Sequence, residues 1–342
     1  MQSKPKILLI YTGGTIGMMK DFETGALKAF NFSKLLNKIP ELKQLDCDIE
    51  TISFEHPIDS SNMNLQKWVQ IAEIIETQYD IFDGFVVLHG SDTMSYSASA
   101  LSFMLENLSK PVVFTGSQLP IGDLRTDAKE NLITAIQIAS LQHKGKPVIN
   151  EVCLYFEYKL YRGNRTTKIN AEHFNAFASP NYPPLAESGV HLKVNRELFL
   201  SKTNSKKFIV HKELDDNVVV VKMFPGINES VLSAILNIPN LKGMVLETYG
   251  SGNAPTDEWL ISALKKAIKS GLHVINVTQC SGGSVSMGQY ETSTSLKKIG
   301  VISGKDSTTE AAITKLMYLL GQQVAANVFK TIFETSIRGE LS

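Results

Sequence analysis

The sequence predicts an α/β protein with a larger N-terminal domain built on a parallel sheet and a smaller C-terminal α/β domain. Three observations predict it. Short continuous apolar runs alternate with helix-period segments, which is typical of βα units around a buried parallel sheet. The length of 342 residues favours about two domains. A charged stretch at residues 191–217 separates two such series of runs.

In the first series, apolar runs predict strands at residues 7–11, 85–88, 112–114 and 152–156. Three segments between them repeat apolar residues at alternating spacings of three and four, which places these residues on one face of a helix. The three sets are Leu65, Trp68, Val69, Ala72 and Ile75; Met94, Ala98, Leu101, Leu105 and Leu108; and Ala128, Leu132, Ala135, Ile136 and Ala139. This alternation predicts a flavodoxin- or Rossmann-like domain.

We place this N-terminal domain at residues 1–190, a charged linker at 191–217 and the smaller domain at 218–342. Within the linker, 208–210 is apolar and could pair as an edge strand. In the smaller domain we expect strands at 218–223, 244–247 and 273–277, with helices near 229–237 and 256–269.

A later helix is expected to begin with a capping box and to end at a glycine. Ser307 and Glu310 have the spacing of a capping box, and Gly321 lies where a helix commonly ends.

Composition excludes several classes of protein. The 34 basic side chains balance the 34 acidic ones, whereas a general nucleic-acid binder usually has a basic excess. The three cysteines are far apart and show no metal or redox spacing, which favours a reducing compartment. No apolar run reaches the length of a membrane span, and no signal sequence is recognisable. We therefore expect a cytoplasmic protein that binds neither nucleic acid nor membrane.

Polar turns follow three of the predicted strands. Residues 12–17 read Thr-Gly-Gly-Thr-Ile-Gly, 89–93 read His-Gly-Ser-Asp-Thr, and 115–118 read Thr-Gly-Ser-Gln. Ligands of open parallel sheets bind at the carboxyl ends of the strands, where glycine allows close approach and hydroxyls supply polar contacts. One such turn alone is common, but three predict a site for a small anionic or zwitterionic molecule.

Rival kinds of site match less well. The glycines lack the spacing of a dinucleotide or P-loop motif, and there is no hydrolase nucleophile elbow. The seven histidines show no metal-binding spacing, so we predict no metal, and His89 is more simply a structural histidine.

Hydroxyl nucleophile chemistry remains, and it requires a base. Lys168 could be that base if burial, or the charges of Arg162 and Arg165, lowered its pKa. The alternative is that residues 161–168 form an exposed basic loop without a catalytic role.

Together these turns resemble the bacterial cytoplasmic type I L-asparaginases. The first two turns are similar to the two family signatures, and the likeness covers nearly the whole chain. Further matches lie at residues 59–61, 115–118, 162–168, 177–181, 249–253, 278–280 and 338–341.

The resemblance implies a two-domain α/β homodimer or homotetramer that hydrolyses L-asparagine to aspartate and ammonia without a cofactor. By position, Thr15 would attack the side-chain amide, and Lys168 would take a proton from Ser91. Asp92 would orient the lysine and meet the substrate ammonium. The resemblance also implies that Asp59, Ser60 and Ser61 bind the substrate and that the Ser91 N–H binds the oxyanion. Asn253 would complete the site of a neighbouring subunit.

The sequence departs from the family pattern at three places. Ser91 stands where most members have threonine, which keeps the hydroxyl. Residues 21–27 correspond to a lid that usually carries a tyrosine, and none is present. Glu247 stands where an arginine would meet a regulatory asparagine, near Thr167 and Cys280, so we expect weak or absent activation by asparagine.

Two alternatives remain open at this point. One is an asparaginase-like subunit that supplies ammonia to a tRNA-dependent amidotransferase, and the other is an amino-acid binding protein without catalysis. The sequence does not set the ratio of asparaginase to glutaminase activity. Asparagine and glutamine differ by one methylene, and a pocket distinguishes such substrates by only about 1–3 kcal/mol of transition-state binding free energy.

Overall fold

The computed structural model describes residues 4–20, 27–29, 39–201, 206–288 and 291–342. The chain divides into two compact units, Met1–Lys212 and Glu213–Ser342. The first unit contains β15 (Lys193–Val194), which falls within the predicted linker 191–217. Among the described residues, no helix has both the length and the apolar character needed to cross a membrane.

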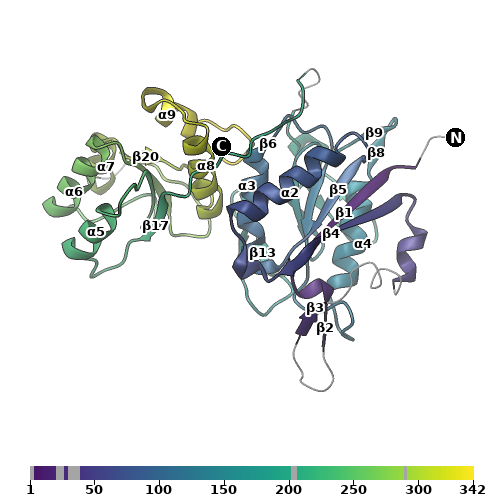
Figure 1. Cartoon of the computed structure of the whole chain (residues 1–342). Coiled ribbons are helices and arrows are strands. Elements are labelled where there is room, and N and C mark those ends of the chain that lie inside the picture. Colours follow the sequence, from purple (N-terminus) through teal and green to yellow (C-terminus); the bar gives the residue numbers. More distant parts are fainter. Residues whose placement is uncertain (1–3, 21–26, 30–38, 202–205, 289–290) are drawn as a thin grey trace. The chain divides into compact units, whose positions relative to one another are not determined.

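The first unit is built on an eight-stranded sheet (Figure 1). Its strand order is β15-β14-β11-β10-β7-β5-β1-β4, and the five strands from β10 to β4 run parallel. The bounds are β1 (Lys6–Gly13), β4 (Asp48–Ile58), β5 (Gly84–Leu88), β7 (Val112–Thr115), β10 (Val152–Phe156), β11 (Lys159–Arg162) and β14 (Ala186–Glu187). The parallel part has the flavodoxin-like order, so the sheet changes winding direction between β1 and β5.

Helices cover both faces of this sheet. Alternate residues of β1 and β10, including Leu9 and Tyr155, pack with α4 (Ala128–Ala139) in one apolar cluster. The opposite face carries α2 (Leu65–Gln78) and α3 (Met94–Met104), and Tyr79 at the end of α2 stacks on Phe85 of β5. The predicted α/β class and the parallel N-terminal sheet are therefore confirmed.

Short elements complete the first unit. The paired strands are β2 (Met18–Lys20) with β3 (Leu27–Ala29), β6 (Leu105–Glu106) with β16 (Ile209–Val210), β8 (Gln142–His143) with β9 (Lys146–Pro147), and β12 (Thr167–Lys168) with β13 (Phe177–Ala178). The 3-10 turns are η1 (Thr15–Gly17), η2 (Pro40–Gln44), η3 (Ser60–Asn62), η4 (Ser91–Thr93), η5 (Gly163–Arg165) and η6 (Arg196–Leu198).

Three features of this unit differ from the sequence prediction. Strand β4 was missed because it lies at the sheet edge, where its alternating and partly charged sequence lacks a continuous apolar run. Helix α3 ends at Met104, so Leu105 and Leu108 lie outside it. Leu105 instead pairs with Val210, which makes the predicted edge segment part of a separate two-stranded ribbon.

The second unit is a smaller α/β layer built on a parallel sheet of order β17-β18-β19-β20. Its strands are β17 (Val218–Lys222), β18 (Gly243–Thr248), β19 (His273–Thr278) and β20 (Ile302–Ser303). Its helices are α5 (Glu229–Leu236), α6 (Glu258–Lys269), α7 (Glu291–Ile299), α8 (Thr309–Gly321) and α9 (Ala326–Phe333). The predicted smaller C-terminal α/β domain is confirmed.

The predicted capping box before α8 is wrong by one residue. The N-cap is Thr308, whose hydroxyl accepts from the Ala311 N–H, while the Ser307 hydroxyl donates to the Gly304 carbonyl. Gly321 does end α8, and a side chain there would collide with the Glu213 backbone, at 2.3 Å from its carbonyl oxygen.

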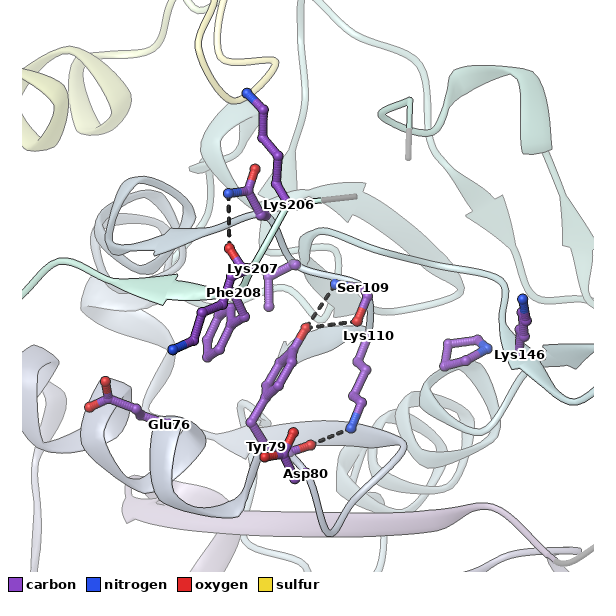
Figure 2. A pocket seen from close by; sticks show the side chains of 12 residues that line it. Glu76, Tyr79, Asp80, Ser109, Lys110, Lys146, Lys206, Lys207 and Phe208 are labelled. Carbon is purple, nitrogen blue, oxygen red and sulfur yellow. Dashed lines mark hydrogen bonds between the residues drawn. The ribbon is translucent and has the colours of Figure 1, made fainter. Parts of the chain in front are cut away.

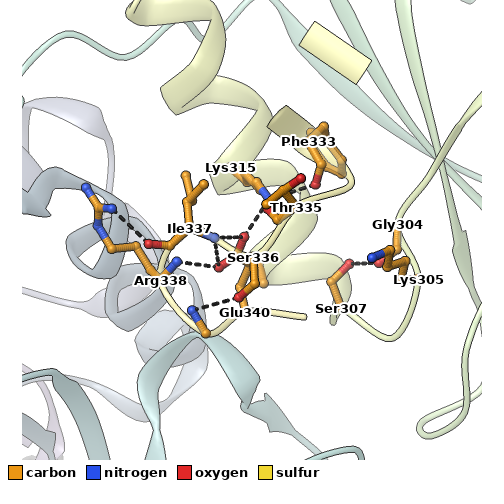
Figure 3. A network of polar contacts seen from close by, with 12 residues as sticks. Gly304, Lys305, Ser307, Lys315, Phe333, Thr335, Ser336, Ile337, Arg338 and Glu340 are labelled. Carbon is orange, nitrogen blue, oxygen red and sulfur yellow. Dashed lines mark hydrogen bonds and ion pairs between the residues drawn. The ribbon is translucent and has the colours of Figure 1, made fainter. Parts of the chain in front are cut away.

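A buried ion pair fixes the C-terminal segment of the second unit (Figure 3). Lys315 and Glu340 are 1% and 0% exposed, and Lys315 Nζ lies 2.5 Å from Glu340 Oε1. The ammonium also donates to the carbonyls of Phe333 and Thr335, each at 2.7 Å. Because the Glu340 carboxylate accepts from the Ile337 and Arg338 N–H groups too, both charges are well solvated by the protein.

Candidate active site

The candidate site lies at the carboxyl edge of the large parallel sheet. Thr15 begins η1 directly after β1, and Ser91 begins η4 shortly after β5. The winding direction changes between these two strands, which is where ligands bind in open α/β sheets. Both residues are half-buried.

Glycines allow three turns of this edge to approach one another closely. A Cβ on Gly14 would lie 2.5 Å from the Gly90 Cα, and one on Gly90 would lie 2.5 Å from Ser60 Oγ. A hydrogen bond also runs from the Thr93 hydroxyl to the Ser60 carbonyl at 2.7 Å. The turns after β1, β4 and β5 are therefore held together, as the polar-turn pattern predicted for two of them.

The turn after β4 is shaped by Asp59. Its Oδ1 accepts from both the N–H and the hydroxyl of Ser61, each at 2.8 Å. The backbone bond and then the hydroxyl bond hold the pKa of Asp59 below its usual range. Ser60 is buried beneath the neighbouring turn and Ser61 is exposed, so only Ser61 is freely accessible from solvent.

Ser91, Asp92 and Lys168 form one polar cluster. Lys168 Nζ lies 2.9 Å from Ser91 Oγ and 2.6 Å from Asp92 Oδ1. The Lys168 side chain is only 17% exposed, whereas that of Asp92 is 64% exposed and has room for a second partner. Strand β12 carries the lysine and is paired with β13, with Lys168 opposite Phe177.

Gln118 contacts this cluster, although the sequence assigned it no role. The Ser91 hydroxyl donates to Gln118 Oε1 at 3.0 Å, so in this state its oxygen accepts a hydrogen bond from Lys168 while its own proton points toward the glutamine. The Gln118 amide nitrogen donates to the carbonyls of Ala171 and His173, each at 3.1 Å, which fixes the direction of the side chain. The only signal in the sequence was its place in the third polar turn.

The segment before Lys168 is buried, which rules out the exposed-loop alternative. Arg162 is 4% exposed, and its Nε lies 2.6 Å from Glu151 Oε2. Arg165 is 2% exposed and lies over the Tyr182 ring. Glu151 thus neutralises Arg162, one of the two proposed sources of positive charge, and the arginines serve to pack this segment.

His89 is a structural residue of the same edge, in agreement with the simpler interpretation. It is fully buried; its Nδ1 lies 2.7 Å from the Gly90 carbonyl oxygen and its Nε2 lies 2.8 Å from Ser97 Oγ. Because a carbonyl only accepts, Nδ1 carries the proton and Nε2 accepts from the serine. Burial lowers the pKa of His89 to about 4, so the ring stays neutral at physiological pH.

Two predicted features are not brought to this cluster within the first unit. Asn253 belongs to the second unit, where its backbone bridges Tyr249 in the turn after β18. Residues 21–26 of the predicted lid lie outside the described residues, and Leu27 belongs to β3. Among the described residues, no three histidine, cysteine or acidic side chains lie close enough to hold a metal ion.

The cluster has the elements of hydroxyl nucleophile chemistry. It combines a threonine on a glycine turn, a second hydroxyl bonded to a lysine, and backbone N–H groups at the starts of short helical turns.

Comparisons with known proteins assign the family. Family models described as "Asparaginase, N-terminal" and "Glutaminase/Asparaginase C-terminal domain" match residues 6–200 and 217–333. The chain therefore belongs to the asparaginase family, which confirms the resemblance seen in the sequence.

Three relatives span nearly the whole chain. It is 43% identical over 340 residues to L-asparaginase 1 of Escherichia coli, covering 99% of this chain and 98% of that protein. The crystal structure of L-asparaginase I from Vibrio cholerae superimposes with a TM-score of 0.91 at 41% identity, covering 99% of each chain. A glutamyl-tRNA(Gln) amidotransferase subunit of Pyrococcus abyssi is 33% identical, covering 99% of this chain and 77% of that protein.

Proposed function

We propose that this protein hydrolyses the side-chain amide of L-asparagine to L-aspartate and ammonia, with Thr15 as the nucleophile. The observation that carries the proposal is the Ser91–Lys168–Asp92 cluster, in which Lys168 Nζ lies 2.9 Å from Ser91 and 2.6 Å from Asp92. Ser91 and Asp92 lie on the turn that packs against the Thr15 turn. The full-length similarity to L-asparaginase 1 supports the choice of substrate.

The reaction proceeds in two steps. Thr15 Oγ gives up its proton and forms a bond to the amide carbon, and the Ser91 N–H stabilises the oxyanion. As the C–N bond breaks, the proton from Thr15 ends on the leaving nitrogen, which departs as ammonia. Water then cleaves the threonyl ester, which releases aspartate and restores the hydroxyl. This division replaces one difficult amide hydrolysis by two easier steps.

Lys168 must lose a proton before it acts as a base. In the structure it donates to Ser91 Oγ, and the Ser91 proton points to Gln118. In the active form the neutral Lys168 accepts from Ser91, whose hydroxyl turns away from Gln118. Asp92 keeps the lysine in place during this exchange through its short contact at 2.6 Å.

The zwitterionic ends of asparagine have matching groups. The exposed Asp92 carboxylate binds the α-ammonium, while the Ser60 and Ser61 turn, ordered by Asp59, binds the α-carboxylate. We further propose that the protein is a homodimer or homotetramer in which Asn253 completes a neighbour's site. The three cysteines are free thiols, which is in keeping with a cytoplasmic location.

The test is ammonia release from free L-asparagine in variants at the two hydroxyls and the lysine. Thr15→Ala and Lys168→Met should lose about a thousandfold or more in kcat, while Ser91→Thr should stay active because it keeps the hydroxyl. Thr77→Ala on the outer face of α2 and Lys242→Met, whose lysine pairs with Asp215, are matched controls.

Near-normal rates in Thr15→Ala or Lys168→Met would remove these roles. The same assay separates the alternatives. A protein that serves only to feed an amidotransferase would release little ammonia from free asparagine in the absence of its partners. A non-catalytic binding protein would bind asparagine and release none.

A further inference from the structure

One cavity of the first unit lies at the amino-terminal edge of the sheet, away from the Ser91 cluster, and Figure 2 shows the side chains that line it. Its volume is about 630 Å³, which is within the usual range for small-molecule sites. Lys110, which lines it, is two residues before the start of β7, whereas the catalytic cluster follows the carboxyl ends of β1 and β5. Asparagine hydrolysis gives this cavity no role.

Four of its lining residues are lysines, namely Lys110, Lys146, Lys206 and Lys207. Its acidic lining residues are Glu76 and Asp80, which leaves an excess of two positive charges (four minus two). Glu76 is already bound by Lys212 at 2.8 Å, outside the lining. The cavity is thus a local positive region in a chain with no net charge.

Lys110 is the fixed cation of this cavity. Its Nζ donates to the Phe82 carbonyl at 2.7 Å and to the Tyr79 carbonyl, and it lies over the Tyr79 ring. An ammonium has three donors, so one remains for a ligand. No carboxylate among the described residues lies within 4.0 Å of it. Burial lowers its pKa, and the more distant carboxylates of Asp83 and Asp80 offset part of this effect.

The other lysines are long side chains on exposed segments around the opening. Lys146 lies on the β8–β9 hairpin, and Lys206 and Lys207 precede β16. None of these three forms an ion pair within the described part of the chain. They can therefore move toward an anion without first breaking a contact with a carboxylate.

Ring stacking and hydrogen bonds hold the wall between these lysines together. The Tyr79 and Phe208 rings stack at 3.8 Å between centroids, and the Tyr79 hydroxyl lies 2.8 Å from the Ser109 N–H, which donates to it. The Asn107 amide donates to the Lys207 carbonyl at 3.1 Å and fixes that part of the backbone. Figure 2 shows the Tyr79 and Phe208 rings together and the contact of Tyr79 with Ser109.

We propose that this cavity binds a polyphosphate group, that is, a di- or triphosphate, free or carried by a nucleotide. One fixed ammonium with an unused donor can bind one phosphoryl group, and the movable lysines can bind the next. A chain of several charges separated by single oxygens fits several lysines around one opening better than a single carboxylate does.

Titration calorimetry with the full chain tests this proposal. Pyrophosphate, tripolyphosphate and ATP should each bind saturably at one site per chain, and adenosine should not bind. Lys110→Met should weaken binding about tenfold or more, as expected for loss of one charge-assisted contact. Lys242→Met, at a lysine paired with Asp215 in the other unit, should bind as the wild type does.

The double variant Lys146→Met/Lys207→Met changes only exposed side chains and gives a second test if Lys110→Met folds poorly. It should weaken pyrophosphate binding by a similar factor and lower its salt dependence. Absence of saturable binding, or unchanged affinity in this double variant, would overturn the proposal. Equal binding of citrate, or much tighter binding of a single-stranded RNA oligonucleotide, would also overturn it.

Discussion

Gly14 packs backbone to backbone against Gly90, the residue that precedes Ser91. A Cβ on Gly14 would lie 2.5 Å from both the Cα and the N of Gly90. Gly14 also has a φ of +83°, which side chains rarely adopt. The close approach fixes the distance between the two turns that carry Thr15 and Ser91, so glycine is required at this position for two separate reasons.

Gly14→Ala should therefore separate the two turns. We expect a loss of about 1–3 kcal/mol in the free energy of unfolding and a fall in kcat of more than about tenfold. Urea denaturation and steady-state kinetics measure the two effects. Gly122→Ala is the control, because a Cβ at Gly122 meets nothing within 4 Å. Equal kinetics of the two variants would contradict this account.

Gln118→Met should lower kcat about tenfold to a hundredfold and change the pH profile of kcat, with little effect on KM. Methionine keeps the approximate length of the side chain but cannot accept the Ser91 hydroxyl or donate to the carbonyls of Ala171 and His173. A purely structural role for Gln118 would lower stability without moving the pH profile. Gln137→Met, on the exposed side of α4, is the matched control.

His89 should make the protein less stable in acid. Its folded pKa of about 4 lies below that of an unfolded histidine, near 6.5, so the unfolded chain binds more protons between these values. The contribution of His89 to the free energy of unfolding is therefore fully present above about pH 6.5. It falls by about 3 kcal/mol as the pH is lowered to 4. His89→Gln should lose correspondingly less over that range, and exposed His143→Gln should follow the wild type. Parallel curves for His89→Gln and the wild type would refute the assignment.

Glu340→Gln should destabilise the protein by about 3 kcal/mol or more, because it leaves the buried Lys315 ammonium without its carboxylate. Lys315→Met combined with Glu340→Leu should recover much of this loss. Lys330→Ala breaks an exposed pair with Glu334 at 3.9 Å and should cost less than about 0.5 kcal/mol. Chemical denaturation monitored by fluorescence measures the free energies of unfolding. Similar losses in Glu340→Gln and Lys330→Ala would show that the buried ion pair does not stabilise the C-terminal segment.

The rate should depend hyperbolically on asparagine concentration. Glu247 is held by the Thr309 hydroxyl at 2.6 Å, and its negative charge should repel a second asparagine carboxylate in that region. Initial rates over a range of asparagine concentrations give the shape of the curve, and equilibrium binding gives the number of asparagine molecules bound per chain. A sigmoidal curve together with a second bound asparagine would show that the expectation is wrong.

The central strands of the fold could be predicted because they are buried on both faces. Residues of β5 and β10 are apolar without interruption, so their runs stand out in the sequence. Edge strand β4 is partly exposed to solvent, so its sequence contains no continuous apolar run. The end of α3 was hidden because Leu105 and Leu108 continue the apolar spacing although the backbone has already turned into β6.

The site could be predicted in part. Glycine and hydroxyl residues at strand ends located the turns of Thr15 and Ser91. Lys168 was one possible base from the residues alone, and the family resemblance paired it with Ser91. Sequence spacing contains no information on which polar partners meet across the fold. The contact from Gln118 to Ser91 joins residues 27 positions apart, and the Lys168 contact spans 77.

Gln118 holds residues 168–173, the segment that begins with Lys168, and this has a consequence for protein engineering. Ala171 and His173 contribute only their main-chain carbonyls to this contact. Their side chains can therefore be exchanged while the segment keeps its position, provided that its length and backbone path are unchanged. Inserting or deleting a single residue between Lys168 and His173 would be far more disruptive than replacing several of them, which makes loop length the quantity to preserve in redesign.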